Sequence, residues 1–193
     1  DVAIDNGRVV AVGSLKGATA ERVIDATGLA VAPGFIDVHT HDDTCVVRTP
    51  EMWPKLSQGV TTVVVGNCGI SAAPVRLRGD PPDPMNLLGR AEDFRYPTFA
   101  AYREAVDRAR PAVNVAALVG HTALRSNCMD RLDRAATPDE IAAMRAELRE
   151  ALGEGALGLS TGLAYASAFA APTEEVIALA EPLADAGGLY ATH

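Results

Sequence analysis

The sequence predicts an α/β fold, a partial (β/α)8 TIM barrel with about five of its eight strands, preceded by a small β unit. Two observations predict this fold. From residue 34 onward, short apolar strand-like segments alternate with amphipathic helical ones, a pattern typical of a parallel sheet with crossover helices. A complete barrel takes roughly 250 residues, so residues 34–193 provide about five strand–helix units. We therefore expect a small β domain in residues 1–33 and, in residues 34–193, a barrel truncated after its fifth strand.

Residues 1–33 have the pattern of a small β unit. Apolar residues alternate on both sides of Asn6-Gly7, and Asn-Gly between apolar runs is a strong signal for a tight hairpin. Residues 22–25 and 29–31 are also strand-like, and Pro33-Gly34 ends the unit. We expect strands in all of these segments.

Five apolar segments after residue 34 are predicted to be strands of the parallel sheet. The segment 61–65 is apolar and β-branched throughout, as expected for a strand that is buried on both faces. The predicted strands cover residues 35–38, 61–65, 113–119, 156–159 and 189–192.

Three helices are predicted between these strands, over residues 98–110, 138–152 and 173–186. The second has the clearest ends, because Thr137 and Glu140 form a capping box and Gly153 follows the last turn. Pro182 is expected to kink or shorten the third helix. The Pro- and Arg-rich segment 71–97 is expected to be a long loop over one face of the sheet.

Composition excludes several classes of function. Lys and Arg number 17 against 25 Asp and Glu, a formal charge of −8, which argues against a nucleic-acid or anionic-membrane partner. No segment has the length and apolar character of a membrane span. Three cysteines without a framework spacing indicate a reducing, cytoplasmic location rather than a disulfide-bonded fold. Nothing in the sequence indicates an oligomeric state.

All four histidines follow predicted strands directly. His39 and His41 are two residues apart at the end of the first strand, so both imidazoles point to the same side. His121 follows the third strand and His193 the fifth. Because barrel active sites gather at the carboxyl ends of strands, this placement favours a metal site over solvated loop histidines. His121 fits a supporting position better than a ligand position.

Two further residues are candidates for the same region. Cys68 follows the second strand, and a thiolate is a strong zinc ligand, although a free cysteine is more often a small buried apolar residue. Tyr165 lies beyond the fourth strand, where it could line a substrate pocket or cover the core. Both interpretations remain open for each residue at this point.

Five motifs resemble known proteins, in order along the whole chain. The segment PGFIDVHTH over residues 33–41 resembles the metal-binding opening of the amidohydrolase superfamily. The segment GVTTVVVGNCGIS over residues 59–71 is more specific and resembles the N-acyl-D-amino-acid deacylases, or D-aminoacylases. The same holds for GHTALR at 120–125, LSTGL at 159–163 and YATH at 190–193.

This resemblance implies a function and a set of ligands. It implies zinc-dependent hydrolysis of the amide bond of small-molecule N-acyl-D-amino acids, with one tightly bound zinc and a second, weaker position. His39, His41, Cys68 and His193 match the metal ligands, with Cys68 as the bridging anion, and Tyr165 is placed in the substrate pocket. The general-base Asp and a further His are expected beyond residue 193, so the 193 residues alone are expected to be inactive.

Three alternatives remain. A cyclic-amide hydrolase of the same superfamily, similar to hydantoinase or dihydropyrimidinase, would need a carboxylated lysine on a barrel strand. The only lysines are Lys16 and Lys55, which both lie outside the predicted strands. A non-catalytic metal-binding fragment is the second alternative. A small copper protein with a His/Cys site is the third, and the capped helices between strands speak against it.

Overall fold

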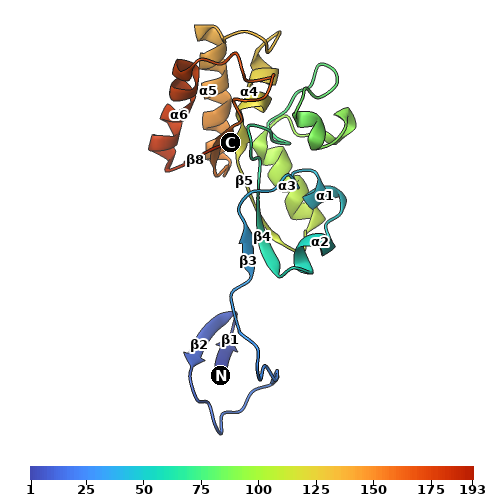
Figure 1. Ribbon diagram of the computed structural model, residues 1–193, viewed down its shortest axis with the longest axis vertical. Coiled ribbons are helices and arrows are strands. Elements are labelled where there is room, and N and C mark those ends of the chain that lie inside the picture. Colours follow the sequence, from blue (N-terminus) through green and yellow to red (C-terminus); the bar gives the residue numbers. More distant parts are fainter. The chain divides into compact units, whose positions relative to one another are not determined.

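The computed structural model describes residues 1–193 and divides into two compact units, Asp1–Gly34 and Phe35–His193 (Figure 1). In the first unit, β1 (Val2–Asp5) and β2 (Arg8–Val12) pair antiparallel. Asn6 and Gly7 have φ angles of 48° and 73°, the left-handed conformation that a two-residue hairpin turn needs. The predicted hairpin is therefore confirmed.

The strands predicted at residues 22–25 and 29–31 are wrong. Both segments are irregular, and only a turn with a hydrogen bond from the Leu29 N–H to the Ala26 carbonyl is formed between them. Their apolar residues are exposed. Strand-like composition does not make a strand unless a neighbouring strand accepts and donates its ladder hydrogen bonds.

The second unit contains two parallel sheets of three strands each, in the orders β3-β4-β5 and β6-β7-β8. The parallel pairing confirms the predicted α/β class. The bounds of the strands are β3 Phe35–Asp37, β4 Val60–Val65, β5 Asn114–Ala117, β6 Val119–Gly120, β7 Gly158–Thr161 and β8 Leu189–Thr192.

One predicted strand, 113–119, is divided between the two sheets. β5 pairs with β4, whereas β6 pairs with β7, and Leu118 between them donates its N–H to the Val65 carbonyl. Gly66 makes this crossing possible, because a Cβ at residue 66 would lie 2.0 Å from the Leu118 carbonyl oxygen. The residues that follow β4 and β5 are consequently held against each other.

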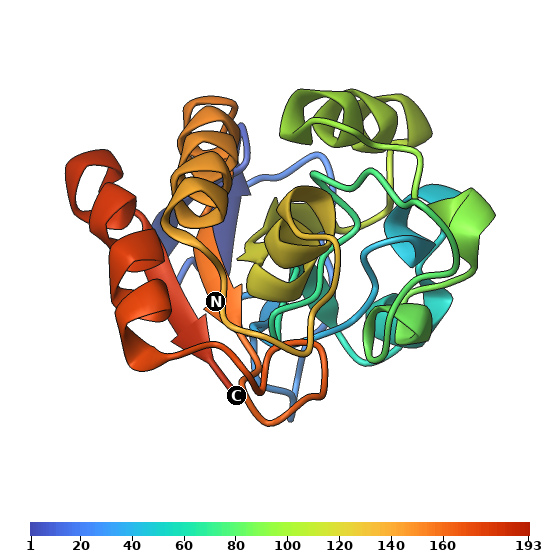
Figure 2. The same ribbon diagram turned by 90° about the horizontal axis from the view of Figure 1, so that it is seen from above.

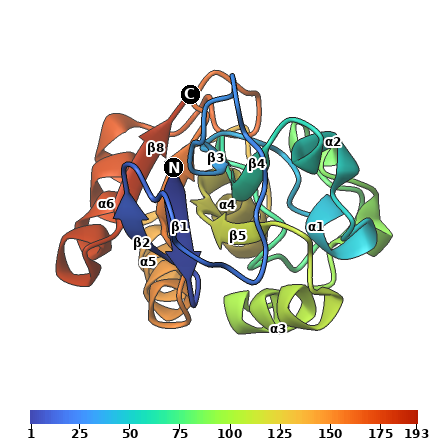
Figure 3. The same cartoon turned by 90° about the horizontal axis from the view of Figure 1, so that it is seen from below.

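Helices connect the strands and flank them in the views from above and below (Figures 2 and 3). The capping box at Thr137 and Glu140 is formed as predicted. Helix α6 continues through Pro182, so the proline does not shorten it. The helices are α1 Cys45–Arg48, α2 Trp53–Leu56, α3 Phe99–Ala109, α4 His121–Cys128, α5 Pro138–Gly153 and α6 Thr173–Ala186, with two 3-10 turns, η1 Met85–Leu87 and η2 Ala91–Asp93.

The main core lies between the strands and the helices α3, α5 and α6. Val63 and Leu159 of the strands are fully buried against Met144, Leu148 and Leu179 of the helices. A second cluster of six buried residues packs the 71–97 segment against α4, so this segment is anchored rather than loose. None of the helices has both the length and the apolar character required to cross a bilayer.

Candidate metal centre

The candidate centre is formed where three strands end. His39 and His41 follow β3, Cys68 follows β4, and His193 follows β8. Backbone hydrogen bonds continue the ladders past the strand ends, from the Thr40 N–H to the Val64 carbonyl and from the His193 N–H to the Thr161 carbonyl. The candidate ligands are therefore held by the same pairing that forms the two sheets.

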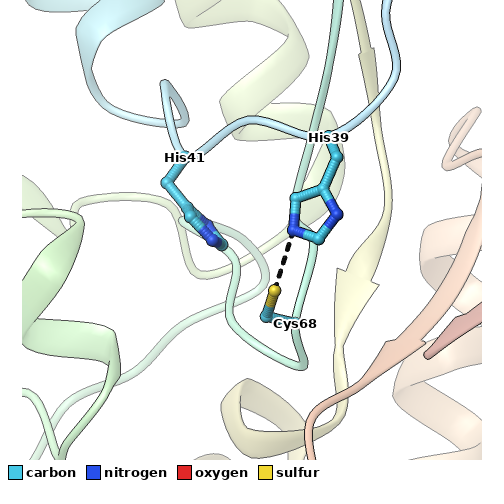
Figure 4. A group of neighbouring side chains, drawn as sticks. All are labelled: His39, His41 and Cys68. Carbon is cyan, nitrogen blue, oxygen red and sulfur yellow. Dashed lines mark hydrogen bonds between the residues drawn. The ribbon is translucent and has the colours of Figure 1, made fainter. Parts of the chain in front are cut away.

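Cys68 lies at the middle of the cluster. Its Sγ is 2.9 Å from Nε2 of His39 and 3.1 Å from Nδ1 of His193. Potential ligand atoms of His39, His41 and Cys68 all lie within 4.8 Å of one another (Figure 4). The bond lengths of zinc put two ligands of one tetrahedral ion about 3.5 Å apart, which lies within the range of 2.9 to 4.8 Å that these separations cover.

His41 shows that the donor set fits a cation. Its Nδ1 is buried and has no hydrogen-bond partner in the protein, which is rare for a buried polar atom. Burial, and then the nearby charges that protonated His39 and His193 would carry, lower the pKa of His41, so its imidazole is neutral at pH 7. A neutral imidazole with a free lone pair is the form that ligates a metal.

The thiol of Cys68 is kept protonated in the absence of a cation. Burial raises its pKa, and a hydrogen bond with Tyr165 only partly opposes this effect. A coordinating metal deprotonates a thiol, so an anion at residue 68 becomes favourable when a cation is bound. Tyr165 also lies beside His193, with ring centroids 5.9 Å apart, so this predicted pocket residue is adjacent to the centre.

Lys55 supports the strand end that carries the two histidines. Its Nζ is 2.6 Å from Asp37 Oδ2 and 3.0 Å from Asp42 Oδ2, and it donates to the Thr40 hydroxyl at 2.9 Å. Asp37 in turn accepts the His39 N–H. These bonds fix the backbone on both sides of His39, and they engage the one lysine near the centre with two carboxylates.

His121 lies outside the cluster. It begins α4 and its Nε2 donates to Oε1 of the buried Glu175 at 2.9 Å. A supporting role within the fold, rather than a ligand role, fits this position. Cys128 is also away from the centre and contacts Glu147.

A cavity of about 530 Å³ opens beside His41, within the size range of small-molecule sites. Its wall combines α1 with the segment that contains η1 and η2. The lining residues include Thr44, Arg48, Asn86, Leu88 and Asp93.

Several buried polar residues have structural roles that sequence reasoning did not assign. Asp43 is 1% exposed and accepts the Ala72 N–H, and burial raises its pKa to about 7. Ser160 is fully buried against the turn that carries Cys68. Glu175 gave one signal, because it shares the helical spacing of the buried Leu179 and Leu183. Nothing in the sequence distinguishes Asp43 or Ser160 from loop and strand residues of other proteins.

A parallel α/β fold with three imidazoles and a thiol gathered at its strand ends has a donor set that suits a metal ion. The sequence model of the amidohydrolase family matches residues 22–192. The chain belongs to the amidohydrolase family.

Named relatives and solved structures agree with this membership. The chain is 55% identical over its whole length to an N-acyl-D-aspartate deacylase of Alcaligenes xylosoxydans xylosoxydans, of which it covers 39%. A structure of D-aminoacylase studied for its binuclear metal centre is 50% identical with a TM-score of 0.94, and the match covers 99% of this chain and 40% of that one. N-acyl-D-glutamate deacylase of Bordetella bronchiseptica, solved with zinc and a phosphonate inhibitor, is 44% identical with a TM-score of 0.90 over 100% of this chain and 40% of that one. The chain thus spans about two fifths of the length of these proteins.

Proposed function

We propose that the protein containing these residues is a zinc-dependent hydrolase that cleaves the amide bond of N-acyl-D-amino acids and releases a carboxylate and a D-amino acid. The observation that carries the proposal is the contact of Cys68 Sγ with imidazoles from two other strand ends. The deacylase names of the similar proteins support the choice of substrate.

The proposed ligands are His39, His41, Cys68 and His193. The similar D-aminoacylase has a binuclear centre that is activated by one metal and attenuated by the second, which supports one tight zinc and one weaker position here. Zinc supplies Lewis acidity toward the amide carbonyl and lowers the pKa of a water molecule. Cys68, as the anion between the histidines, offsets the charge of the cation.

Other residues have proposed roles in binding and proton transfer. Tyr165, beside His193, is proposed to contact the substrate, and the cavity beside His41 offers space for part of a small molecule. The carboxylate that moves the proton from water to the leaving nitrogen is proposed to come from outside the 193 residues. Residues 34–193 are proposed to be part of a (β/α)8 barrel, with residues 1–33 as a small β domain. The three free cysteines support a cytoplasmic location.

The test is a rate comparison on the intact protein, with whatever sequence its gene adds to these 193 residues. Zinc-loaded protein is assayed on N-acetyl-D- and N-acetyl-L-forms of aspartate, glutamate and methionine. Hydrolysis of D-substrates only is the expected result. Equal rates, or a preference for L-substrates, would contradict the stereochemical part of the proposal.

Two cysteine variants distinguish the loss of a metal ligand from general damage to the fold. Cys68→Ala is expected to lose bound zinc and turnover together, because the anionic ligand is removed. Cys128→Ala changes a partly buried cysteine away from the centre and is expected to keep both. Metal content by mass spectrometry and turnover are measured on the same samples, and a Cys68→Ala protein that retains its zinc would refute the ligand assignment.

Two other functions are tested by related experiments. A hydantoinase-like activity is disfavoured because Lys55 is bound by Asp37 and Asp42, and ring opening of hydantoin or dihydrouracil by the intact protein would favour it instead. A metal-binding chain without catalysis is the expected behaviour of the 193-residue polypeptide alone. We expect it to hydrolyse nothing measurable, and turnover by a purified 193-residue chain would overturn this expectation.

A further inference from the structure

The turn that carries Cys68, residues Gly66–Gly69, has an unusual backbone. Gly66, Cys68 and Gly69 have φ angles of 78°, 56° and 76°, so three of its four residues are in the left-handed region. Glycine adopts this region freely, but a residue with a side chain is strained there. The conformation of Cys68 therefore needs support from its surroundings, and this conformation sets the direction of its thiol.

One buried hydroxyl supplies that support at both ends of the turn. Ser160, in β7, accepts the Gly69 N–H at 3.0 Å through its Oγ and donates to the Gly66 carbonyl at 2.5 Å. The side chain is fully buried, so water cannot replace either bond. A hydroxyl is suited to this position because it donates one hydrogen bond and accepts others.

The end of β7 also packs tightly against the same turn. A Cβ added at Gly162 would lie 2.2 Å from the Cys68 carbonyl oxygen, and one at Gly69 would lie 2.8 Å from the Gly162 nitrogen. Ser160 thus acts where backbones are in direct contact, and a shift of the turn would move the Cys68 thiol relative to His39 and His193. Those contacts, at 2.9 and 3.1 Å, leave little tolerance for such a shift.

We propose that Ser160 is a positioning residue of the metal centre, whose hydroxyl holds the Gly66–Gly69 turn so that the Cys68 thiol lies between His39 and His193. This inference rests on the proposed function, because it requires that Cys68 bind a metal. Ser160 itself touches neither metal nor substrate in the proposal, and it acts only through the turn.

The test measures metal binding rather than turnover. Co²⁺ is titrated into the metal-free intact protein, and both its dissociation constant and the thiolate-to-cobalt charge-transfer absorption are recorded for wild type and Ser160→Ala. We expect affinity to fall about 10- to 100-fold, as for other residues that orient metal ligands, with a weakened charge-transfer band. Wild-type affinity and an unchanged band in folded Ser160→Ala protein would overturn the proposal.

Thr122→Val is the matched control. Thr122 is fully buried, and its hydroxyl makes one hydrogen bond, with the Ser167 hydroxyl, and none to the turn. Valine has nearly the same shape, so this variant loses a buried hydroxyl elsewhere in the unit. Its Co²⁺ affinity and spectrum are expected to equal those of wild type, and an equal loss in both variants would contradict a specific role for Ser160.

Two outcomes keep this inference separate from the proposed function. Wild-type protein that binds Co²⁺ through a thiolate but hydrolyses no N-acyl-D-amino acid contradicts the proposed reaction and leaves Ser160 assigned. Wild-type protein that binds no Co²⁺ contradicts both. If Ser160→Ala does not fold, Ser160→Thr carries the test, because it keeps the oxygen and adds one methyl. A wild-type spectrum despite lower thermal stability then supports the assignment, and an altered spectrum contradicts it.

Discussion

Glu175, in the first turn of α6, forms a fully buried group with two residues of α4: an ion pair with Arg125 and a hydrogen bond with His121. Arg125 uses its remaining donors on backbone carbonyls, including that of Ser167 at 3.1 Å, and Glu175 also accepts the Ala136 N–H. The group therefore connects α4, α6 and the loop that follows β7. A buried charge is tolerated here because its partners neutralise it and its polar atoms are hydrogen-bonded.

We predict that Glu175→Gln destabilises the protein by about 3–5 kcal/mol, because it leaves the Arg125 charge buried without its partner. Urea unfolding of the intact protein measures the loss. Glu174→Gln changes the exposed neighbour in the same helical turn and is expected to stay within about 0.5 kcal/mol of wild type. Equal stability of the two variants would contradict the buried ion pair.

The same carboxylate predicts a pH dependence. Burial would raise the pKa of Glu175, but hydrogen bonds from His121, Arg125 and the Ala136 N–H outweigh it and hold the pKa at about 2, against 4.5 for a free glutamate. The stabilisation is thus complete above about pH 4.5 and is lost as the pH falls through about 2. The stability difference between wild type and Glu175→Gln should shrink over that window, and a difference independent of pH would refute this assignment.

The positions of side chains at strand ends were predictable, because the local sequence pattern shows where each strand ends. His39, His41, Cys68 and His193 each follow a short apolar run, and parallel strands bring such positions to one edge. Ser160 was not predictable, because its importance depends on the turn of another strand packing against it. The roles of the three histidines and Cys68 as metal ligands stay a prediction until metal binding is measured.

At the level of single elements, helix ends followed the sequence closely. The predicted helices 138–152 and 173–186 differ from α5 and α6 by at most one residue. Helix α4 was missed because most of its eight residues are polar although six of them are buried, so its sequence has too few apolar residues to show a buried face. The split of 113–119 into β5 and β6 was missed because a mostly apolar segment has the same sequence pattern whether it stays in one sheet or passes to another.

The cap of α5 gives a prediction at this scale. The Thr137 hydroxyl accepts the Glu140 N–H at 3.3 Å, and the Glu140 carboxylate accepts the Thr137 N–H at 2.8 Å. Thr137→Ala should lower the free energy of unfolding by about 1 kcal/mol, visible as a lower thermal midpoint. Thr173→Ala, at the start of α6 where no side chain caps the helix, should leave the midpoint nearly unchanged. A larger loss in Thr173→Ala would contradict the capping role.

At the scale of the whole unit Phe35–His193, the outer strands β3 and β8 each pair with one neighbour only. Apolar side chains are exposed along both: Phe35 and Ile36 on β3, and Leu189 and Tyr190 on β8. An exposed apolar edge with free backbone donors and acceptors is a template for pairing with another chain. The 193-residue polypeptide therefore has two surfaces on which copies can associate.

We predict that the 193-residue polypeptide self-associates as its concentration rises, and that Ile36→Glu suppresses this, because a charge on the edge strand opposes pairing. Ile177→Glu is the matched control, since Ile177 on α6 is 58% exposed against 61% for Ile36 but lies on a helix. Light scattering coupled to size-exclusion chromatography gives the mass at each concentration. If both variants reduce association equally, general surface hydrophobicity rather than the β3 edge drives association. A wild-type polypeptide that stays monomeric at all concentrations would show that the strand edges do not mediate association.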